Sequence, residues 1–263
     1  MKYEIIDFHT HPFLSQNGNI CPYKEYIDLT TENTPEYMKK AGISKMVGSA
    51  WCEKNDDESH IEHLKRANDA TIKLTEEYNG FLVPGFHIHP AFVKESCMEI
   101  ERISKLGVKY MGEFVPHGEW CDLSKKEYDE ILDVALQYNV IFNLHSTDTD
   151  NMEELIKKHP KNIIVAAHPG EKTRFLKHLE RMKLSENFYL DLSGTGIFRL
   201  GLINRGIKEF GAERFIFGTD FPVCTPSMYV GGIAFEPSLT ENEKELILSK
   251  NAKRLFKECG IDI

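Results

Sequence analysis

Two histidines one residue apart, His9 and His11, end an apolar run near the start of the chain. Alternate residues of an extended strand point to the same side, so both imidazoles can be directed at one point in space. Imidazole nitrogens are common ligands of transition metals, and this spacing is compatible with a metal site. The pair alone is a weak indication, because histidines at this spacing also occur by chance. A metal site therefore needs further ligands from elsewhere in the chain.

The rest of the chain repeats one unit, a short apolar strand followed by a helix. We expect strands near residues 4–11, 43–50, 81–86, 108–114, 140–145, 162–167, 188–192 and 215–218. Helices are expected near residues 34–41, 56–79, 95–106, 124–136, 151–159, 171–184, 197–210 and 240–260. Two capping boxes, Ser124 with Glu127 and Thr240 with Glu243, predict where two of these helices begin.

Eight strand–helix units with nearly continuous apolar strands predict a parallel sheet covered by helices. Eight units fit an α/β fold of the (β/α)8 TIM barrel type. The competing fold is an open, doubly wound sheet, but no glycine-rich phosphate loop follows the first strand. No linker divides the sequence, so we expect one TIM-barrel domain over residues 1–263.

The composition is that of an ordinary globular protein, with 41% hydrophobic and 28% charged residues. No stretch approaches the roughly 20 apolar residues that cross a bilayer, and the first residues lack the features of a signal peptide. We therefore expect a cytoplasmic protein without a membrane partner. The six cysteines form no short pair and are expected to be free thiols. The net charge of -9 disfavours a nucleic-acid partner. The sequence leaves the oligomeric state open, and a homo-oligomer is compatible with it.

The C-terminal ends of the strands of such a barrel meet at one mouth, which carries the active site. Metal-ligand side chains stand at five of the predicted strand ends: His9 and His11, Glu113, His145, His168 and Asp220. Four imidazoles and two carboxylates at the same end predict a metal centre. This donor set suits Zn²⁺ first, and also Mn²⁺, Fe²⁺ or Co²⁺, better than Ca²⁺ or Mg²⁺.

The same residues carry a resemblance to a known family. The matching segments are His9-Thr10-His11, His145, His168-Pro169-Gly170, Asp191-Leu192-Ser193-Gly194, Gly218-Thr219-Asp220-Phe221-Pro222 and Asn251-Ala252-Lys253-Arg254-Leu255-Phe256. Over almost its whole length the chain resembles the amidohydrolase superfamily. Within it, the chain resembles the amidohydrolase-related branch of metal-dependent hydrolases, which also includes the aminocarboxymuconate-semialdehyde decarboxylase group. The resemblance implies a TIM barrel whose metal centre is formed by His9, His11, His145, His168 and Asp220.

The number of ions depends on Glu113. Many two-metal relatives carry a carboxylated lysine on strand four, whereas Gly112-Glu113 resembles the Gly-Glu motif of TatD-type deoxyribonucleases. A bridging Glu113 would complete a first site with His9, His11 and Asp220, and a second site with His145 and His168. Without the bridge one ion remains, and His145 and His168 are divided between metal ligation and substrate polarisation. We expect two ions.

A divalent ion lowers the pKa of a bound water from 15.7 towards about 7 and polarises a carbonyl or phosphoryl oxygen. The first expectation is therefore a metal-dependent hydrolase of a small-molecule ester, lactone, amide or related bond, with Asp220 as general base. The alternative is a metal-dependent non-oxidative decarboxylase of a small carboxylic acid. A TatD-like nuclease or phosphoesterase comes third. A catalytically silent binding protein is disfavoured by the complete set of ligands.

Other polar residues are weaker candidates. His89 stands at the end of the third predicted strand, where substrate contact competes with plain packing. His117 and Arg199 lie on predicted strand-to-helix loops and are candidates to bind substrate, Arg199 as a clamp for a carboxylate or phosphate, against the alternative of ordinary loop residues. Asp7 shares a strand face with His9, which predicts either a hydrogen bond to that histidine or a buried structural carboxylate. The histidines on charged helices are expected on the solvated surface; they are His60, His63, His159 and His178.

Overall fold

The computed structural model describes residues 2–147 and 151–263. Its eight strands form one parallel sheet in chain order. They are β1 (Ile6–Thr10), β2 (Lys45–Gly48), β3 (Leu82–Phe86), β4 (Tyr110–Phe114), β5 (Ile141–His145), β6 (Ile164–Ala167), β7 (Phe188–Asp191) and β8 (Phe215–Ile216). The chain after β8 returns to β1, where the amide of Phe8 donates to the carbonyl of Phe217 at 2.9 Å. The predicted single-domain TIM barrel is confirmed.

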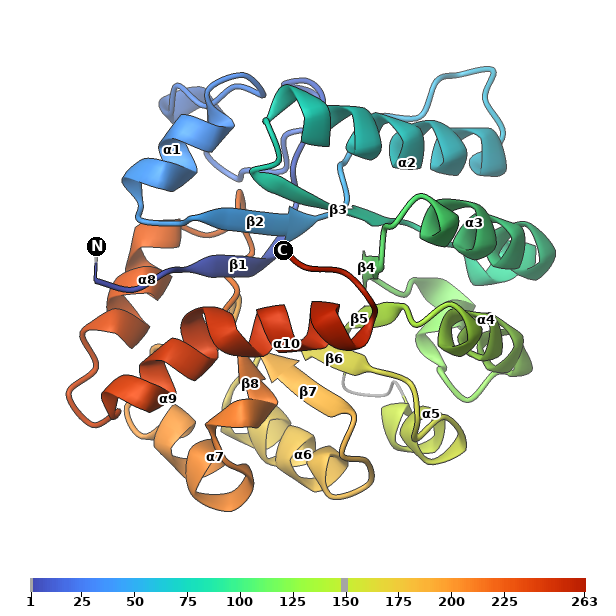
Figure 1. The fold of residues 1–263 in the computed structure, drawn as a ribbon. Helices are drawn as coiled ribbons and strands as arrows, with labels where there is room; N and C mark the ends of the chain where they lie inside the picture. The colour runs from blue at the N-terminus through green and yellow to red at the C-terminus, as the bar shows by residue number, and fades with distance from the viewer. Residues whose placement is uncertain (1, 148–150) are drawn as a thin grey trace.

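Helices surround the barrel and alternate with its strands (Figure 1). They are α1 (Thr34–Lys40), α2 (His60–Glu77), α3 (Val93–Lys105), α4 (Lys126–Gln137), α5 (Met152–Lys158), α6 (Lys172–Met182), α7 (Leu202–Phe210), α8 (Pro226–Ala234), α9 (Glu241–Glu245) and α10 (Asn251–Glu258). A larger core of buried apolar side chains lies between the strands and these helices. The helices thus give the strands a fixed scaffold on the outside of the barrel.

One end of the barrel is closed by α10, which crosses in front of the strands in Figure 1. Side chains that point into the barrel, such as Phe8 and Tyr110, form a separate core with Leu255 and Phe256 of α10. Phe8 packs edge-on against Tyr110, with ring centroids 5.2 Å apart. Because this core fills the end where the strands begin, access to the barrel interior remains at the C-terminal ends of the strands.

Some predicted element boundaries were wrong. The box at Ser124 does not cap a helix, because its hydroxyl donates to Asp122 at 2.7 Å and α4 begins at Lys126. The box at Thr240 is confirmed, with both reciprocal hydrogen bonds to Glu243. The helix expected over 240–260 is divided by a π-helical turn, Leu246–Lys250, between α9 and α10. Helix α8 was not predicted, since its uncharged sequence has no polar face.

Two helical glycines offer a matched test of packing between α7 and the barrel. A methyl group on Gly206 would lie 2.3 Å from Cζ of the buried Phe215, whereas one on Gly232 of α8 would meet nothing within 4 Å. We expect Gly206→Ala to lower the free energy of unfolding by about 1–3 kcal/mol through overpacking. Gly232→Ala should raise it by about 0.5–1 kcal/mol, because alanine favours helices. Urea denaturation measures both, and equal effects would contradict the packing.

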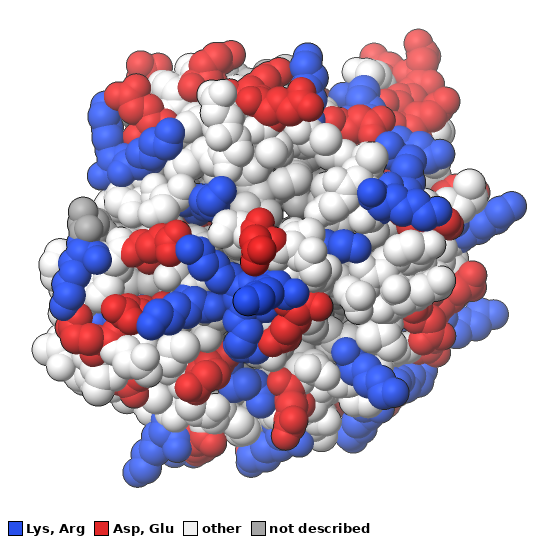
Figure 2. All heavy atoms as spheres, viewed as in Figure 1, with Lys and Arg blue, Asp and Glu red and all other residues white. Residues whose placement is uncertain are grey.

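The face with α10 mixes both signs of charge (Figure 2). A row of lysines and arginines along α10 is paired with acidic side chains. Lys253 lies 2.6 Å from Glu4, and Arg254 lies 3.0 Å from Glu258. This face therefore has no uninterrupted basic surface, and the expected absence of a nucleic-acid partner stays a prediction. Within the described ranges, no helix combines the length and apolar character needed to span a membrane.

Candidate metal centre

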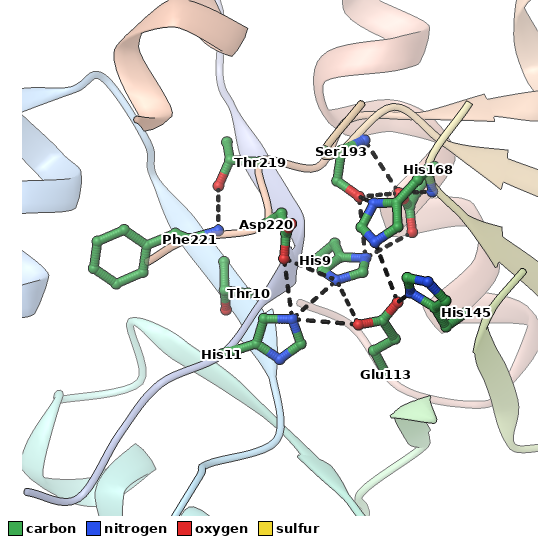
Figure 3. A network of polar contacts seen from close by, with 12 residues as sticks. His9, Thr10, His11, Glu113, His145, His168, Ser193, Thr219, Asp220 and Phe221 are labelled. Atoms are coloured by element: carbon green, nitrogen blue, oxygen red, sulfur yellow. Dashed lines mark hydrogen bonds and ion pairs between the residues drawn. The ribbon is translucent and has the colours of Figure 1, made fainter. Parts of the chain in front are cut away.

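His9 and His11 lie at the C-terminal end of β1 with both imidazoles directed at the same point (Figure 3). Their Nε2 atoms are 3.2 Å apart, and both side chains are buried. Nδ1 of His9 is held by the Asp191 carboxylate at 2.9 Å. That contact leaves Nε2 of His9 as the atom that faces the shared point. The strand alternation therefore places the two histidines as the sequence predicts.

Asp220 and Glu113 complete a group of four donor atoms around this point. Nε2 of His11 lies 3.2 Å from Oδ1 of Asp220 and 3.4 Å from Oε2 of Glu113. Nε2 of His9 lies 3.3 Å from the same Glu113 oxygen and 3.8 Å from Asp220. Around a tetrahedral ion with ligands at about 2.0–2.2 Å, neighbouring donors lie roughly 3.3–3.6 Å apart. The spacing and the donor types fit a divalent transition metal.

A second donor group lies beside the first, at the ends of β4, β5 and β6. Oε1 of Glu113 is 2.8 Å from Nδ1 of His145 and 3.4 Å from Nε2 of His168. The three ligand atoms lie within 4.8 Å of one another. This group has three protein donors, and the side chain of His145 is 30% exposed. It resembles a metal site with an open position more than a closed structural site.

Glu113 therefore stands between two groups, with one carboxylate oxygen towards each (Figure 3). Burial opposes its ionisation, but the imidazoles of His9, His11, His145 and His168 hold its pKa well below the usual range. Burial likewise opposes protonation of His9, yet the Asp191 and Glu113 carboxylates raise the pKa of that imidazole well above its usual value. The cluster thus stabilises positive charge at its centre, which is the electrostatic requirement for a cation.

Asp191 contacts this cluster, although the sequence pattern assigned it no role of its own. Its Oδ2 atom contacts His9 and also accepts from Nδ2 of Asn143 at 2.9 Å. Its Oδ1 atom accepts from the Ser193 amide at 3.1 Å and from the Ser193 hydroxyl. With both oxygens engaged, Asp191 orients imidazoles and is a weaker candidate for ligation, although it lies within reach of His9 and His168. Asp191 is the last residue of β7, so its position at the C-terminal end of a strand was the sequence feature that could have identified it.

Ser193 extends the same support to His168. Its hydroxyl lies 2.9 Å from Nδ1 of His168 and 3.2 Å from Nδ1 of His9. His168 itself has a left-handed backbone, with φ of 66°. Such a conformation is uncommon for residues other than glycine and is often found at functional sites. The contact with Ser193 leaves Nε2 of His168 directed at Glu113.

Removing the charge of Asp191 should weaken metal binding without removing a ligand. We expect Asp191→Asn to lower the affinity for divalent metal by about 10- to 100-fold, because the amide no longer fixes the orientation and basicity of His9. Competition with a chromogenic chelator measures the affinity. Asp262→Asn, at an exposed position near the C-terminus, is the matched control. An unchanged affinity in Asp191→Asn would contradict the orienting role.

Asp7 supports the segment that carries Asp220. Its buried carboxylate accepts from the amide of Thr219 at 2.9 Å and from the hydroxyl of Thr219 at 2.6 Å. It also accepts from the amide of His9 at 3.3 Å. Burial raises the pKa of Asp7 to about 7, against the effect of the Thr219 hydrogen bonds. Asp220 has φ of 67°, and its amide donates to the carbonyl of His9 at 2.9 Å, so the turn is tied directly to β1.

The three predicted substrate residues are not equally near this centre. His89 and His117 line a cavity whose wall also includes Glu113. Arg199 lies elsewhere, in an ion pair with Glu171 at 2.8 Å in which both side chains are more than half exposed. Because its guanidinium is engaged at the surface, the structure does not bring Arg199 to the metal centre.

Comparisons with known proteins agree with the fold. A 2,6-dihydroxybenzoate decarboxylase in complex with 2,6-dihydroxybenzoate superposes with a TM-score of 0.78 at 18% identity, covering 97% of this chain and 99% of that chain. A 5-carboxyvanillate decarboxylase from Sphingomonas paucimobilis superposes with a TM-score of 0.75 at 16% identity, covering 97% of this chain and 99% of that chain. A dihydroxybenzoic acid decarboxylase from Polaromonas, with bound manganese and 2-nitroresorcinol, superposes with a TM-score of 0.73 at 18% identity, covering 97% of both chains. At these identities the likeness shows the fold alone.

Most of the neighbours reported are decarboxylases by name, and three of them contain manganese. The comparisons confirm neither hydrolysis nor zinc for this chain. No curated protein sequence matches the chain. The sequence pattern of the family described as Amidohydrolase matches residues 6–257, and the chain therefore belongs to the amidohydrolase family.

Proposed function

We propose that the chain is a two-ion hydrolase of a small-molecule ester, lactone, amide or related bond. The position of Glu113 carries the proposal, because its two carboxylate oxygens face two separate groups of ligand atoms. His9, His11 and Asp220 would hold the first ion with Glu113. His145 and His168 would hold the second with the same carboxylate. Two ions that share a ligand are typical of metal-dependent hydrolytic sites.

The exposure of the two carboxylates suggests which of them transfers protons. Bound divalent ions would supply a water of lowered pKa and polarise the bond under attack. Asp220 accepts the proton of the attacking water and returns it to the leaving group, as a general base and then a general acid. Its side chain is 13% exposed, whereas that of Glu113 is 3% exposed. Asp220 is therefore the carboxylate better placed to exchange a proton with a substrate.

Decarboxylation of a small aromatic acid is the second candidate. It is favoured by the structural neighbours, several of which are decarboxylases that act on such acids, as their names indicate. In that reaction the centre would orient a carboxylate, the C–C bond would break, and a proton would be delivered to carbon. The third candidate, a nuclease, has the Gly112-Glu113 motif in its favour and the net charge of -9 against it. The cytoplasmic location and the oligomeric state also stay predictions.

One screen separates the two reactions. The protein is stripped with chelator, reconstituted with Zn²⁺ or Mn²⁺, and assayed on lactones, amides, phosphoesters and aromatic or enolic acids. Acid release in a pH-stat reports hydrolysis, and CO₂ release reports decarboxylation. We expect acid release, with about two ions per chain by mass spectrometry of the metal content. Metal-dependent CO₂ release with a single ion would overturn the hydrolase proposal, and a failure to hold stoichiometric metal would overturn both candidates.

A further inference from the structure

A cleft leads away from Glu113 along the end of β3 towards the start of α2. It consists of two adjoining cavities of about 160 and 190 Å³ that share Trp51, His87, Ile88 and His89. Glu113 belongs to the wall of the first cavity only. We call the two cavities together the strand-three cleft. None of its lining residues has a role in the metal centre apart from Glu113.

The strand-three cleft has almost no charged lining. Among the described residues of its lining, Glu113 is the only carboxylate, and no lysine or arginine lines either cavity. Arg66 contacts the Cys52 thiol of the lining at 3.4 Å, but it is ion-paired with Glu58 at 2.7 Å and lines neither cavity. Lys125 lies over the Trp120 ring, 5.1 Å from its centroid, but it is ion-paired with Glu119 at 3.0 Å and does not line the cavity. An anionic group would therefore meet only cations that already have an acidic partner, and burying an unpaired charge is costly. The lining favours an uncharged occupant.

The walls of the cleft are flat rings. Trp120 meets His89 edge to face, with centroids 6.3 Å apart and an interplanar angle of 76°. Trp51 meets His87 with centroids 6.1 Å apart and an angle of 62°. Trp51 is 40% exposed, an unusual degree of exposure for the largest apolar side chain. Aromatic walls of this kind pack well against another flat ring.

The two shared imidazoles also present defined hydrogen-bonding atoms. Nδ1 of His89 accepts from the amide of Ala91 at 3.1 Å, so its proton lies on Nε2. Nε2 of His87 lies 3.3 Å from the carbonyl of Ala50, so it donates there and Nδ1 keeps its lone pair. Burial lowers the pKa of His87 to about 4 and also lowers that of His89, which keeps both rings neutral at pH 7. The cleft thus offers a donor and an acceptor without a charge.

We propose that the strand-three cleft binds an uncharged, flat ring of the substrate, with a hydrogen-bonding edge, beside Glu113. The reacting bond would lie at Glu113, so this inference rests on the proposed function for that end of the substrate. The ring itself is recognised by Trp51 and Trp120 as walls and by His87 and His89 as polar contacts. The binding of such a ring can be measured without turnover.

The chain supplies its own reporter for this test. Trp51 and Trp120 are its only tryptophans, so intrinsic tryptophan fluorescence reports on the cleft alone. Three probes are titrated into the metal-reconstituted protein: benzamide, its saturated counterpart cyclohexanecarboxamide, and the charged benzoate. We expect benzamide to bind at least about tenfold more tightly than either of the others. Equal affinity for benzamide and cyclohexanecarboxamide, or no saturable signal from benzamide, would overturn the proposal. Because the benzoate carboxylate can bind the ions directly, the charge preference is judged in chelator-treated protein, where tighter binding of benzoate than of benzamide would overturn the uncharged class.

Variants link the preference to the cleft. Trp120→Leu keeps Trp51 as reporter and should reduce the preference for benzamide to less than about threefold, whereas Trp120→Phe should retain most of it. Phe198→Leu, at an exposed position that lines neither cavity, should leave it unchanged. Circular dichroism checks that each variant is folded. A folded Trp120→Leu protein with the full preference would contradict the role of the cleft.

The same titration on chelator-treated protein separates this inference from the proposed function. The ring preference should persist without metal, because none of the contacts that carry it involves His9, His11 or Asp220. Ring binding that persists in a protein without hydrolase activity would contradict the proposed function and support the ring-binding role of the cleft. Hydrolysis of saturated and aromatic esters at equal rates would support the proposed function and contradict the ring-binding role of the cleft.

Discussion

Asp220→Asn is expected to lower the turnover of any substrate found by about 10²- to 10⁴-fold, the usual contribution of a general acid–base residue. The asparagine side chain keeps an oxygen 3.2 Å from Nε2 of His11, so a ligand atom is retained while the proton acceptor is lost. The main effect should therefore fall on kcat, with a smaller change in metal content. Steady-state kinetics and the metal content of the same preparation measure the two effects.

Asp262→Asn serves as the control for this substitution, since Asp262 is exposed and distant in sequence from every strand end. If Asp220→Asn retained full turnover with stoichiometric metal, the assignment of Asp220 as general base would be wrong. If turnover and metal were lost together, Asp220 would act chiefly as a ligand.

Glu113→Gln is expected to reduce the number of tightly bound divalent ions from two to one. A neutral amide cannot provide two anionic oxygens, and the second group would be left with only His145 and His168 as donors. The first group keeps His9, His11 and Asp220, which meets the three protein ligands of many single-metal sites. Metal content after dialysis against a weak chelator measures the change, and hydrolysis should fall with the loss of the second ion.

Glu119→Gln is the matched control, because Glu119 is an exposed glutamate only a few residues further along the chain. Two ions retained in Glu113→Gln would show that Glu113 is no bridge. A single ion in the unaltered protein would also show that Glu113 does not bridge two ions, and it would favour the decarboxylase candidate.

The barrel and the meeting of most candidate ligands at one end of it were predictable, because both follow from short-range patterns. Apolar runs such as 140–145 define strands, and the position of His145 at the end of such a run defines where its side chain lies. The sequence could not show which side chains from different loops pair with each other. Arg199 stands on a strand-to-helix loop as expected, but Glu171, from another loop, holds it at the surface. Nothing in the local sequence of Arg199 indicates that pairing.

The buried histidines show the same limit. His159 and His178 were expected on the surface because their helices are charged, yet both are buried. His159 is placed by a hydrogen bond between its Nε2 atom and Asp129 of α4 at 2.9 Å. His178 stacks on Phe188 of β7 with centroids 6.3 Å apart. Each partner is at least ten residues away along the chain, so helix periodicity alone could not identify which face of these helices is covered.

The closure of the barrel by α10 has a consequence for the order of folding. The interior core joins residues from β1, such as Phe8, to Phe256, and the Glu4–Lys253 pair lies at the same end. Contacts between residues so far apart in the chain carry a high entropic cost and form slowly. During synthesis, the strands emerge long before the helix that seals them. The inner apolar surface therefore stays open to water, and to other chains, until α10 has left the ribosome.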